Sequence, residues 1–337
     1  MGTMATIKDV AKVAGVSTAT VSAVINESAF VSAELRDRVM SAVAELRYSP
    51  SMVARNLKRG RSQLLAVVVA DLSNPFFARL VWAAEAAVAA WGYSLVLFNS
   101  DEKPETEKRV LARIRMLGCD GLLLSPVGGS DQNRYRELDG IPVVLLGGPV
   151  DSDAVDTVTI DNRSAGRLAT DYLLDLRHTR IGSITGPLQL STGRGRNQGF
   201  LEALSARGLA PSPGDVRSGE FREDAAYSIA RELLAQPDRP TALYVANGVM
   251  ALGAMRAIVD LGLHCPRDVS IVSTDTIAGI AGVWPRLTRT EHPVADMTNE
   301  ALRMLVDRID DKVTLPARNI VFQPTLVIGD SCAPFEM

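Results

Sequence analysis

Positively charged side chains, which can bind a polyanion, are concentrated at the start of this 337-residue chain. The first sixty residues hold eight lysines and arginines against five acidic residues, a net charge of +3, whereas the remainder carries −6. A basic module on an acidic body is typical of a protein that binds nucleic acid at one end. The difference is modest, so it supports nucleic-acid binding without establishing it.

Residues that perform catalysis or bind metals form no recognisable pattern. The sequence lacks a P-loop, a G-x-S-x-G motif and an H-E-x-x-H motif. Its three histidines are widely separated, and its three cysteines form no C-x-x-C pair. The glycine-rich stretch Gly193-Arg-Gly195 follows the predicted strand Ile181–Thr185 by too many residues for a dinucleotide site. We therefore expect no enzymatic activity, no metal and no cofactor.

The composition is that of a globular protein with two or three domains, because 47% of the residues are hydrophobic and 22% are charged. No apolar run reaches the ~18 residues that a membrane span needs. The first charged residues are not followed by the apolar stretch of a signal peptide. We expect a cytoplasmic protein with no membrane partner and with free cysteine thiols.

The first fifty residues are predicted to form helices without strands. Apolar stripes indicate helices at Ile7–Ala14, at Thr18–Glu27 and from Ser32 to about Arg47. Side chains that can cap these helices precede each of them, namely Thr6, Ser17 and Ser32. Two short helices separated by Gly15 indicate a helix-turn-helix. A generic three-helix bundle would carry the same stripes and is the alternative.

A short basic segment follows these helices. Pro50 suits the first position of a helix, and Ser51–Leu57 is shorter than the ~12 residues that an isolated helix needs in water. Three basic residues come next, namely Lys58, Arg59 and Arg61. We expect a short helix that is ordered only when bound, or a solvated interdomain linker.

From Leu64 onward, apolar strands alternate with helices in two successive sets. Continuous apolar strands such as Leu64–Ala70 are typical of parallel sheets covered on both faces. The alternation is too long for one sheet and predicts two lobes, with a ligand cleft at the carboxyl ends of the strands. We expect a helix-turn-helix in the first fifty residues, a linker after it, and a two-lobed domain from residue 62 onward.

Several segments carry a resemblance to a known family. The longest is Ala5-Thr-Ile-Lys-Asp-Val-Ala-Lys-Val-Ala-Gly-Val-Ser-Thr-Ala-Thr-Val-Ser22, and others include Asp71-Leu-Ser-Asn-Pro-Phe-Phe77, Arg196-Asn-Gln-Gly-Phe200 and Met250-Ala-Leu-Gly-Ala254. Together they resemble the LacI family of lactose-repressor and purine-repressor type. The resemblance implies an all-α helix-turn-helix head and an α/β two-lobed sensor domain of the type I periplasmic-binding-protein-like class. It places the head at 1–49, a hinge helix and linker at 50–61 with the helix at 51–57, and an effector-binding and dimerisation domain at 62–337. The two lobes are expected at about 62–161 with 293–322, and at 162–292 with 323–337. It also implies a repressor whose operator affinity is controlled by a small polar ligand, such as a sugar or sugar derivative.

The resemblance assigns residues to the DNA interface. The helix at Thr18–Glu27 is expected to enter the major groove. Base edges are expected near Thr18, Ala19, Ala23 and Ala29, and phosphate or local backbone contacts at Thr20, Ser22 and Asn26. Leu57 matches a leucine that family members insert into the minor groove, and Lys58 matches a basic neighbour.

Ala23 departs from the family, whose members commonly carry Arg or His there. Ala19 and Ala29 also lack hydrogen-bond donors. Because a methyl group cannot read guanine by a bidentate pair, each lost pair removes about 1–3 kcal/mol of discrimination. We expect weaker direct readout and a larger contribution from the hinge and from DNA shape.

The resemblance also assigns residues to an effector site between the lobes. They are Phe76, Phe77, Ser125, Asp161, Thr192, Arg196, Phe221, Asn247 and Asp275. Aromatic faces suit a sugar ring or a flat base, carboxylates and amides suit hydroxyl groups, and arginine suits an oxygen-rich ligand. For one of the two neighbouring phenylalanines, core packing is the alternative.

Three further departures bear on the ligand. Gly248 and Gly147-Gly148 replace residues that are often acidic in the family, and Leu190 replaces an arginine of the purine-sensing branch. A roomier and less acidic pocket is expected. With Arg194 near Arg196, a sugar phosphate or sugar acid is a hypothesis, and a solvent-facing Arg194 is the alternative.

Two other classes of protein were weighed against a regulator. A periplasmic solute-binding protein would carry a signal peptide and no helix-turn-helix, and an enzyme on a doubly wound fold would need a catalytic set. For a regulator we expect a homodimer on a pseudo-palindromic operator, with ligand binding coupled to the hinge. The ligand could release or tighten DNA binding, and both remain open. The absence of leucine heptads after Asp330 favours a dimer over a tetramer.

Overall fold

The computed structural model describes residues 5–48, 61–128, 138, 140–147, 155–275, 285–310 and 316–336. It divides into two compact units, Met1–Ser62 and Gln63–Met337, each with its own hydrophobic core. The hinge helix expected at 51–57, with Leu57, lies outside the described residues. So do Lys58, Gly148 and all but the last residue of a short helix predicted at Gln132–Leu138.

The first unit is the predicted helical head, with α1 (Ile7–Ala14), α2 (Thr18–Asn26) and α3 (Ala33–Glu45). Thr6 and Asp9 form a capping box at the start of α1, and Ser17 accepts a hydrogen bond from the Thr20 amide. Ser32 occupies the N-cap position of α3, as predicted, but its side chain makes no capping hydrogen bond. The three helices bury a small apolar core.

The turn between α1 and α2 is fixed by a glycine and an arginine. Gly15 has φ of +63°, a left-handed conformation that favours glycine. Arg38 of α3 donates hydrogen bonds to the carbonyls of Ala14 at 2.5 Å and Gly15 at 3.3 Å. A Cβ at position 15 would lie 2.7 Å from the Arg38 Nη2 atom. This basic residue therefore stabilises the helix-turn-helix.

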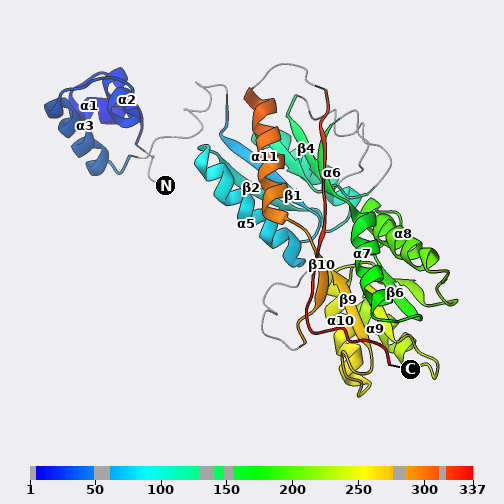
Figure 1. Cartoon of the computed structure of the whole chain (residues 1–337). Coiled ribbons are helices and arrows are strands. Elements are labelled where there is room, and N and C mark those ends of the chain that lie inside the picture. Colours follow the sequence, from blue (N-terminus) through cyan, green and yellow to red (C-terminus); the bar gives the residue numbers. More distant parts are fainter. Residues whose placement is uncertain are drawn as a thin grey trace. The chain divides into compact units, whose positions relative to one another are not determined.

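The second unit contains two six-stranded sheets, one in each lobe (Figure 1). The sheet of lobe 1 is parallel throughout and has the order β11-β5-β4-β3-β1-β2. Its strands are β1 (Leu64–Val69), β2 (Ser94–Asn99), β3 (Gly121–Leu124), β4 (Val143–Leu146), β5 (Asp156–Ile160) and β11 (Asn319–Phe322).

The sheet of lobe 2 has the order β12-β10-β9-β8-β6-β7, and only β12 runs antiparallel to its neighbour. Its strands are β6 (Ile181–Thr185), β7 (Val216–Ser218), β8 (Ala242–Val245), β9 (Ser270–Thr274), β10 (Thr288–Glu291) and β12 (Thr325–Val327). The sequence did not predict β7 or β10, because both segments are short and polar.

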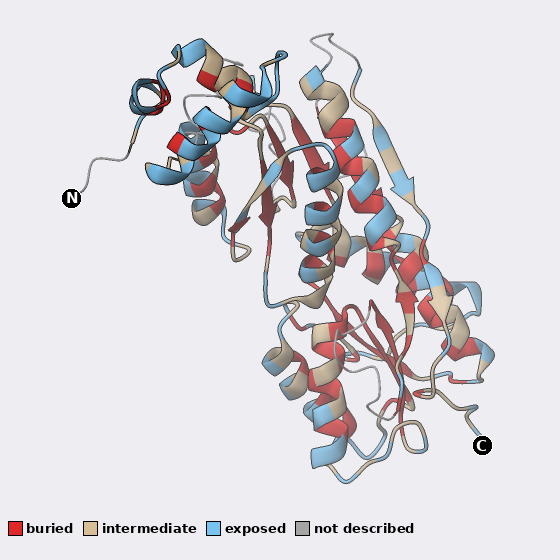
Figure 2. Cartoon of the chain, turned by 90° about the vertical axis from the view of Figure 1, so that its left-hand side faces the viewer, coloured by how far each residue is buried: buried red, intermediate tan, exposed pale blue. Residues whose placement is uncertain are grey.

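Helices cover both faces of each sheet, as Figure 2 shows by the buried strands and the half-exposed helices. Lobe 1 has α5 (Pro75–Ala90), α6 (Pro104–Leu117) and α11 (Val294–Asp310). Lobe 2 has α7 (Asn162–Asp175), α8 (Ser191–Ala206), α9 (Glu223–Leu234) and α10 (Gly248–Asp260). The predicted combination of a helical head with a two-lobed α/β domain is confirmed.

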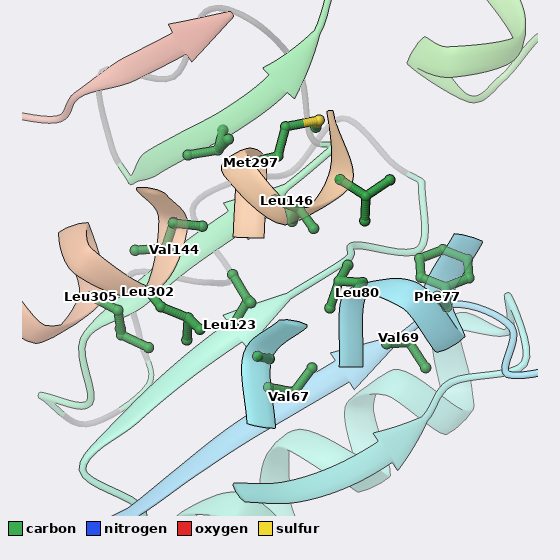
Figure 3. Packing of buried hydrophobic residues seen from close by; sticks show 14 of the residues in the cluster. Val67, Val69, Phe77, Leu80, Leu123, Val144, Leu146, Met297, Leu302 and Leu305 are labelled. Carbon is green, nitrogen blue, oxygen red and sulfur yellow. The ribbon is translucent and has the colours of Figure 1, made fainter. Parts of the chain in front are cut away.

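Strand β1 shows why its apolar run is continuous. Leu65, Val67 and Val69 pack on the face covered by α5 and α11. Figure 3 shows Val67 and Val69 in this packing from close by. Ala66 and Val68 point to the opposite face, where α6 packs. A strand buried on both faces needs apolar residues at every position, as the sequence indicated.

The chain crosses between the lobes at three places, because β5 precedes α7, β10 precedes α11, and β11 precedes β12. The start of α8 lies three residues before the prediction, at Ser191 rather than Arg194. Gly193 lies in this first turn, and a Cβ there would lie 2.3 Å from the Pro187 carbonyl oxygen. The glycines thus serve close packing of the helix start, not a dinucleotide loop.

Candidate functional site

The exposed face of α2 carries the residues predicted to read bases. Thr18 and Ala19 are exposed, Ala23 is half-buried, and Ala29 is exposed in the turn that follows. Val21 and Val24 lie on the opposite side in the core of the head. The helix can therefore present Thr18, Ala19 and Ala23 to a groove while its other side stays packed.

The three residues predicted to contact phosphate also make local hydrogen bonds. Thr20 hydrogen-bonds to Ser17 through its hydroxyl at 2.9 Å and through its amide at 3.1 Å. The Asn26 amide donates to the Ser22 carbonyl oxygen at 2.8 Å and to its hydroxyl at 3.2 Å. Of these three side chains, only Asn26 bonds to a backbone atom, whereas the hydroxyls of Thr20 and Ser22 bond to neighbouring side chains. The bonds orient all three side chains on α2.

Phe30 is a candidate that the sequence reasoning missed. Its side chain is 99% exposed in the turn between α2 and α3, next to Ala29. An aromatic residue directly after the small and polar stretch Glu27–Ala29 was the available signal. Such a ring can contact a thymine methyl group or a sugar when DNA is bound.

In the second unit, the predicted effector residues gather at the carboxyl ends of the strands. Asn247 and Asp275 follow β8 and β9 in lobe 2, and Ser125 and Asp161 follow β3 and β5 in lobe 1. This is where ligands bind in open parallel sheets. The observed topology therefore places these four residues at the carboxyl ends of their strands, as the sequence predicted.

Arg196 of α8 is the centre of a hydrogen-bonded cluster with Asn162, Ala246 and His292 on the lobe 2 side, called the hub below. Only 8% of the residue is exposed, and burial lowers the pKa of its guanidinium. It donates hydrogen bonds to Asn162 Oδ1 at 2.9 Å, to the Ala246 carbonyl at 2.6 Å and to His292 Nε2 at 3.1 Å. Three of its five N–H groups are thus used, which leaves two for a ligand.

Phe221 lies beneath this arginine. The Arg196 guanidinium carbon is 5.9 Å from the centre of the Phe221 ring, a cation–π distance. A Cβ at Gly186 would lie 2.1 Å from that ring, so the absence of a side chain after β6 makes room for it. Phe221 has a φ of +54° and is half-buried.

Asn247 and Asp275 are both buried polar residues beside this hub. Asn247 caps α10, because its Oδ1 accepts from the Met250 amide at 2.8 Å. Its Nδ2 atom has no partner among the described residues. Asp275 has φ of +67°, and its carboxylate lies 3.8 Å from Arg79 Nη1 of lobe 1. Both are placed to hydrogen-bond to a polar ligand.

The two phenylalanines at the start of α5 have different surroundings. Phe77 belongs to the buried core of lobe 1, as the core-packing alternative predicted for one of the pair. Phe76 is half-buried and meets the ring of His292 edge-on, with centroids 6.1 Å apart. Phe76 is therefore the aromatic residue that lobe 1 brings toward the polar hub of lobe 2.

The structure does not join the other predicted residues to this hub. Both carboxylate oxygens of Asp161 cap α7, at 2.8 Å from the Ser164 amide and 2.7 Å from its hydroxyl. Ser125 is half-buried after β3, and its amide donates to the Val68 carbonyl. Thr192 is a half-buried residue of the first turn of α8. Their assignment to an effector stays a prediction.

His292 is the second residue that the sequence reasoning missed. It is 2% exposed, follows β10, and lies between Arg196 and Phe76. The three histidines were considered only as metal ligands, and β10 was not predicted. The signal was a histidine at the end of a segment that joins the two lobes.

Two sets of ion pairs cross from one lobe to the other. Arg222 of lobe 2 lies 3.3 Å from Asp71 and 3.7 Å from Glu102 of lobe 1. Burial raises the pKa of Glu102, and the nearby carboxylate of Asp71 raises it further. Arg79 of lobe 1 lies 3.6 Å from Glu291 as well as near Asp275. These pairs place the lobes close together around the hub.

The structure also locates the residues that depart from the family pattern near the effector site. Gly147 has φ of +81°, and Gly248 is the first residue of α10. Because both are glycines, neither supplies a side chain to the site. Leu190 contacts the other lobe, since a Cβ at Gly128 would lie 2.4 Å from its Cδ2. Arg194 is exposed and donates to the Leu188 carbonyl at 3.3 Å, as its solvent-facing alternative predicted. The described geometry does not support a paired-arginine clamp for phosphate.

Other kinds of site were searched for in the described parts of the chain. No cluster of three or more metal-ligating residues occurs there, and no helix there is long and apolar enough to cross a membrane. All three cysteines are free, and burial raises the pKa of Cys265 to about 12. A groove of about 520 Å³ between Trp91 and Arg303 on lobe 1 includes none of the predicted effector residues.

Comparison with known proteins gives two family matches. Residues 6–51 match the family described as "Bacterial regulatory proteins, lacI family". Residues 170–332 match a "Periplasmic binding protein-like domain". The first match covers the helical head, and the second covers most of lobe 2 together with α11 and β11.

Relatives resemble the chain over nearly its whole length. The HTH-type transcriptional repressor PurR of Edwardsiella ictaluri (strain 93-146) is 37% identical over 98% of this chain and 97% of its own. The PurR of Yersinia pestis (strain Pestoides F) is 36% identical over 99% of both chains. These alignments therefore include both the head and the two lobes.

Solved structures with the same fold include two regulators. A lac repressor dimer bound to operator and the anti-inducer ONPF has a TM-score of 0.85, with 26% identity over 98% of this chain and 99% of its own. The transcriptional regulator CelR in complex with cellobiose has a TM-score of 0.73, with 32% identity over 97% and 99%.

Proposed function

Because this chain belongs to the LacI family of DNA-binding transcriptional repressors, we propose that a small, oxygen-rich, carbohydrate-like effector controls its affinity for a DNA operator. The chain is a regulator and not an enzyme, as its relatives are. The effector would bind between the lobes of the second unit. A repressor that acts on the chromosome works in the bacterial cytoplasm.

One observation carries the proposal for the ligand. Arg196, Asn247 and Asp275 converge at the carboxyl ends of lobe 2 strands, and each of them is at least nine-tenths buried. Asn247 keeps an unpaired amide nitrogen, and Arg196 keeps two N–H groups without a partner in the described residues. Buried polar groups without partners are costly, so a ligand with several oxygen atoms would satisfy them.

Aromatic rings flank this polar set. Phe221 lies under Arg196, and Phe76 approaches from lobe 1. A ring with a polar edge and apolar faces, as in a sugar, would suit a site with aromatic and polar groups of this kind. Cellobiose, the ligand named for the similar CelR structure, is the first compound to test. A phosphate group is not favoured, because Arg194 lies outside the hub.

For the head, we propose that α2 enters the major groove and that the protein binds as a homodimer. The similar lac repressor structure is a dimer bound to operator, which supports the same arrangement here. Two heads would then contact two inverted half-sites. Thr18, Ala19, Ala23 and Ala29 would lie near base edges. Leu57 and Lys58 would act in the minor groove, as proposed from the family resemblance.

The test begins with selection of operator sites from a random duplex DNA library by the full-length protein. An inverted repeat is expected. Operator affinity is then measured by fluorescence anisotropy with cellobiose, ribose, ribose 5-phosphate, gluconate and hypoxanthine, each added alone. A neutral sugar should change the affinity in either direction. If only hypoxanthine acts, the carbohydrate proposal fails. If only ribose 5-phosphate or gluconate acts, the preference for a neutral sugar fails, and if no site is selected, the DNA proposal fails.

A further inference from the structure

His292 presents an unsatisfied hydrogen-bonding edge inside the proposed effector cleft. The residue is 2% exposed, and its Nδ1 atom has no partner among the described residues. Its Nε2 atom lies 3.1 Å from Arg196 Nη2. The ring therefore has one edge against the hub of the site and one edge that lacks a partner.

The contact with Arg196 determines which ring nitrogen carries the proton. Guanidinium nitrogens only donate hydrogen bonds, so His292 Nε2 must accept. An Nε2 atom that accepts carries no hydrogen, and a neutral ring must then carry its proton on Nδ1. Asp275 does not reverse this assignment, because its Oδ2 atom is 3.9 Å from Nε2, too far for a hydrogen bond.

The surrounding charges keep the ring neutral. Burial lowers the pKa of His292 well below its usual value, and the positive charges of Arg196 and Arg79 lower it further. The acidic groups nearby are already engaged, since Asp275 and Glu291 lie within 4 Å of Arg79. The unpaired edge is thus an N–H donor rather than an acceptor.

We propose that His292 is held by Arg196 as the Nδ1–H tautomer and donates a hydrogen bond to an oxygen atom of the effector. His292 then selects ligands that present an acceptor oxygen at this position, such as a sugar ring or hydroxyl oxygen. This inference rests on the proposed function, because it assigns a further binding residue to the same cleft. Phe76, edge-on to the imidazole, limits how far the ring can turn.

The tautomer can be measured without any ligand. Long-range proton–nitrogen NMR spectra of the full-length protein with 15N-labelled histidine distinguish the two neutral tautomers and the cation. The chain supplies an internal control, because His178 Nε2 lies 3.1 Å from the Ala333 carbonyl, which only accepts. His178 should carry its proton on Nε2, and His292 on Nδ1. The spectrum of His292→Gln assigns the signals.

Two variants test the roles of the two ring nitrogens of His292 separately. An asparagine amide occupies nearly the same place as Nδ1, and a glutamine amide the same place as Nε2. His292→Asn keeps the donor toward the effector, whereas His292→Gln keeps the acceptor for Arg196. With cellobiose as the probe, the Gln variant should lose about tenfold in affinity, and the Asn variant should lose much less.

The outcomes are distinct. An Nε2–H tautomer or an imidazolium at neutral pH overturns the inference, and so does a Gln variant that binds cellobiose as tightly as the native chain. If cellobiose does not bind, the affinity comparison is repeated with the compound from the operator experiment that does. If no compound binds, the proposed effector class fails, and the tautomer still decides whether Arg196 sets the state of His292. Melting temperatures of both variants show whether folding is preserved.

Discussion

Arg222 Nη1 lies 3.3 Å from Asp71 Oδ2, and this ion pair joins lobe 2 to lobe 1. Asp71 is mostly buried, whereas 45% of the Arg222 side chain is exposed. A contact present only when the lobes are close together stabilises that arrangement and not a more open one. A ligand held between the lobes would share in this stabilisation, because linkage couples its binding to closure.

The first prediction concerns this pair. Arg222→Gln should weaken effector binding by about two- to fivefold, the range expected of a partly exposed ion pair worth less than 1 kcal/mol. The salt dependence of effector binding should fall as well, since salt screens exposed charges. Both are measured by calorimetric titration at two salt concentrations.

Arg217→Gln is the matched control. Arg217 pairs with Glu232 within lobe 2, and both side chains are exposed. It should leave effector affinity unchanged. Equal effects of the two substitutions would mean that the Arg222 pair has no particular role in closure.

The second prediction concerns Asn247. Asn247→Asp keeps the oxygen that caps α10 but replaces the unpaired Nδ2 donor with an acceptor. Effector affinity should fall by at least about tenfold, because a donor is lost and a charge is introduced into a buried site. Operator affinity without effector should change little, and the melting temperature measures what the buried charge costs the fold. A variant that binds the effector normally would remove Asn247 from the site.

The sequence predicted local features of the fold well, because they depend on neighbouring residues. The Thr6–Asp9 capping box, the Ser17 cap and the doubly buried strand β1 all follow from residues a few positions apart. Strand β10 was missed because its four residues are polar, and its pairing with β9 depends on the fold. Local patterns therefore identify elements better than their partners.

The hub of the site could not be predicted in the same way. The partners of Arg196 are 34, 50 and 96 residues away in sequence, so their convergence is a property of the fold. Family resemblance placed Arg196, Asn247 and Asp275 in the cleft, and the structure brings them near one another. The family resemblance gave no reason to consider His292, and it did not distinguish Phe76 from the buried Phe77.

The third prediction concerns a buried carboxylate in lobe 1. Asp156 accepts hydrogen bonds from Arg308 at 2.7 Å and from Arg318 at 3.0 Å, which connect β5 to α11 and to the segment before β11. Although burial raises the pKa of Asp156, these bonds hold it below its ordinary value of 3.8. Asp156→Asn should cost about 3 kcal/mol of unfolding free energy, measured by urea denaturation.

The stabilisation that Asp156 provides depends on pH in a defined way. Because the pKa of Asp156 is lower in the folded state, its stabilisation is complete above its ordinary pKa of 3.8 and is lost as the pH falls through the folded value. The difference between native protein and variant should therefore shrink only in that acidic range. Asp175→Asn, which affects an exposed pair with Arg207, is the control and should change little. A constant difference at all pH values would mean that charge is not responsible.

The last prediction concerns readout by α2. Ala23 is half-buried on the helix proposed to enter the major groove, and its methyl group cannot form a bidentate pair. Ala23→Arg should gain a preference for guanine at one position of each half-site, worth about 1–3 kcal/mol, in selection from random duplex DNA. Ser41→Arg adds the same charge on α3 and should strengthen binding without a base preference. If Ala23→Arg behaves like Ser41→Arg, position 23 does not face the bases, and the proposed orientation of α2 is wrong.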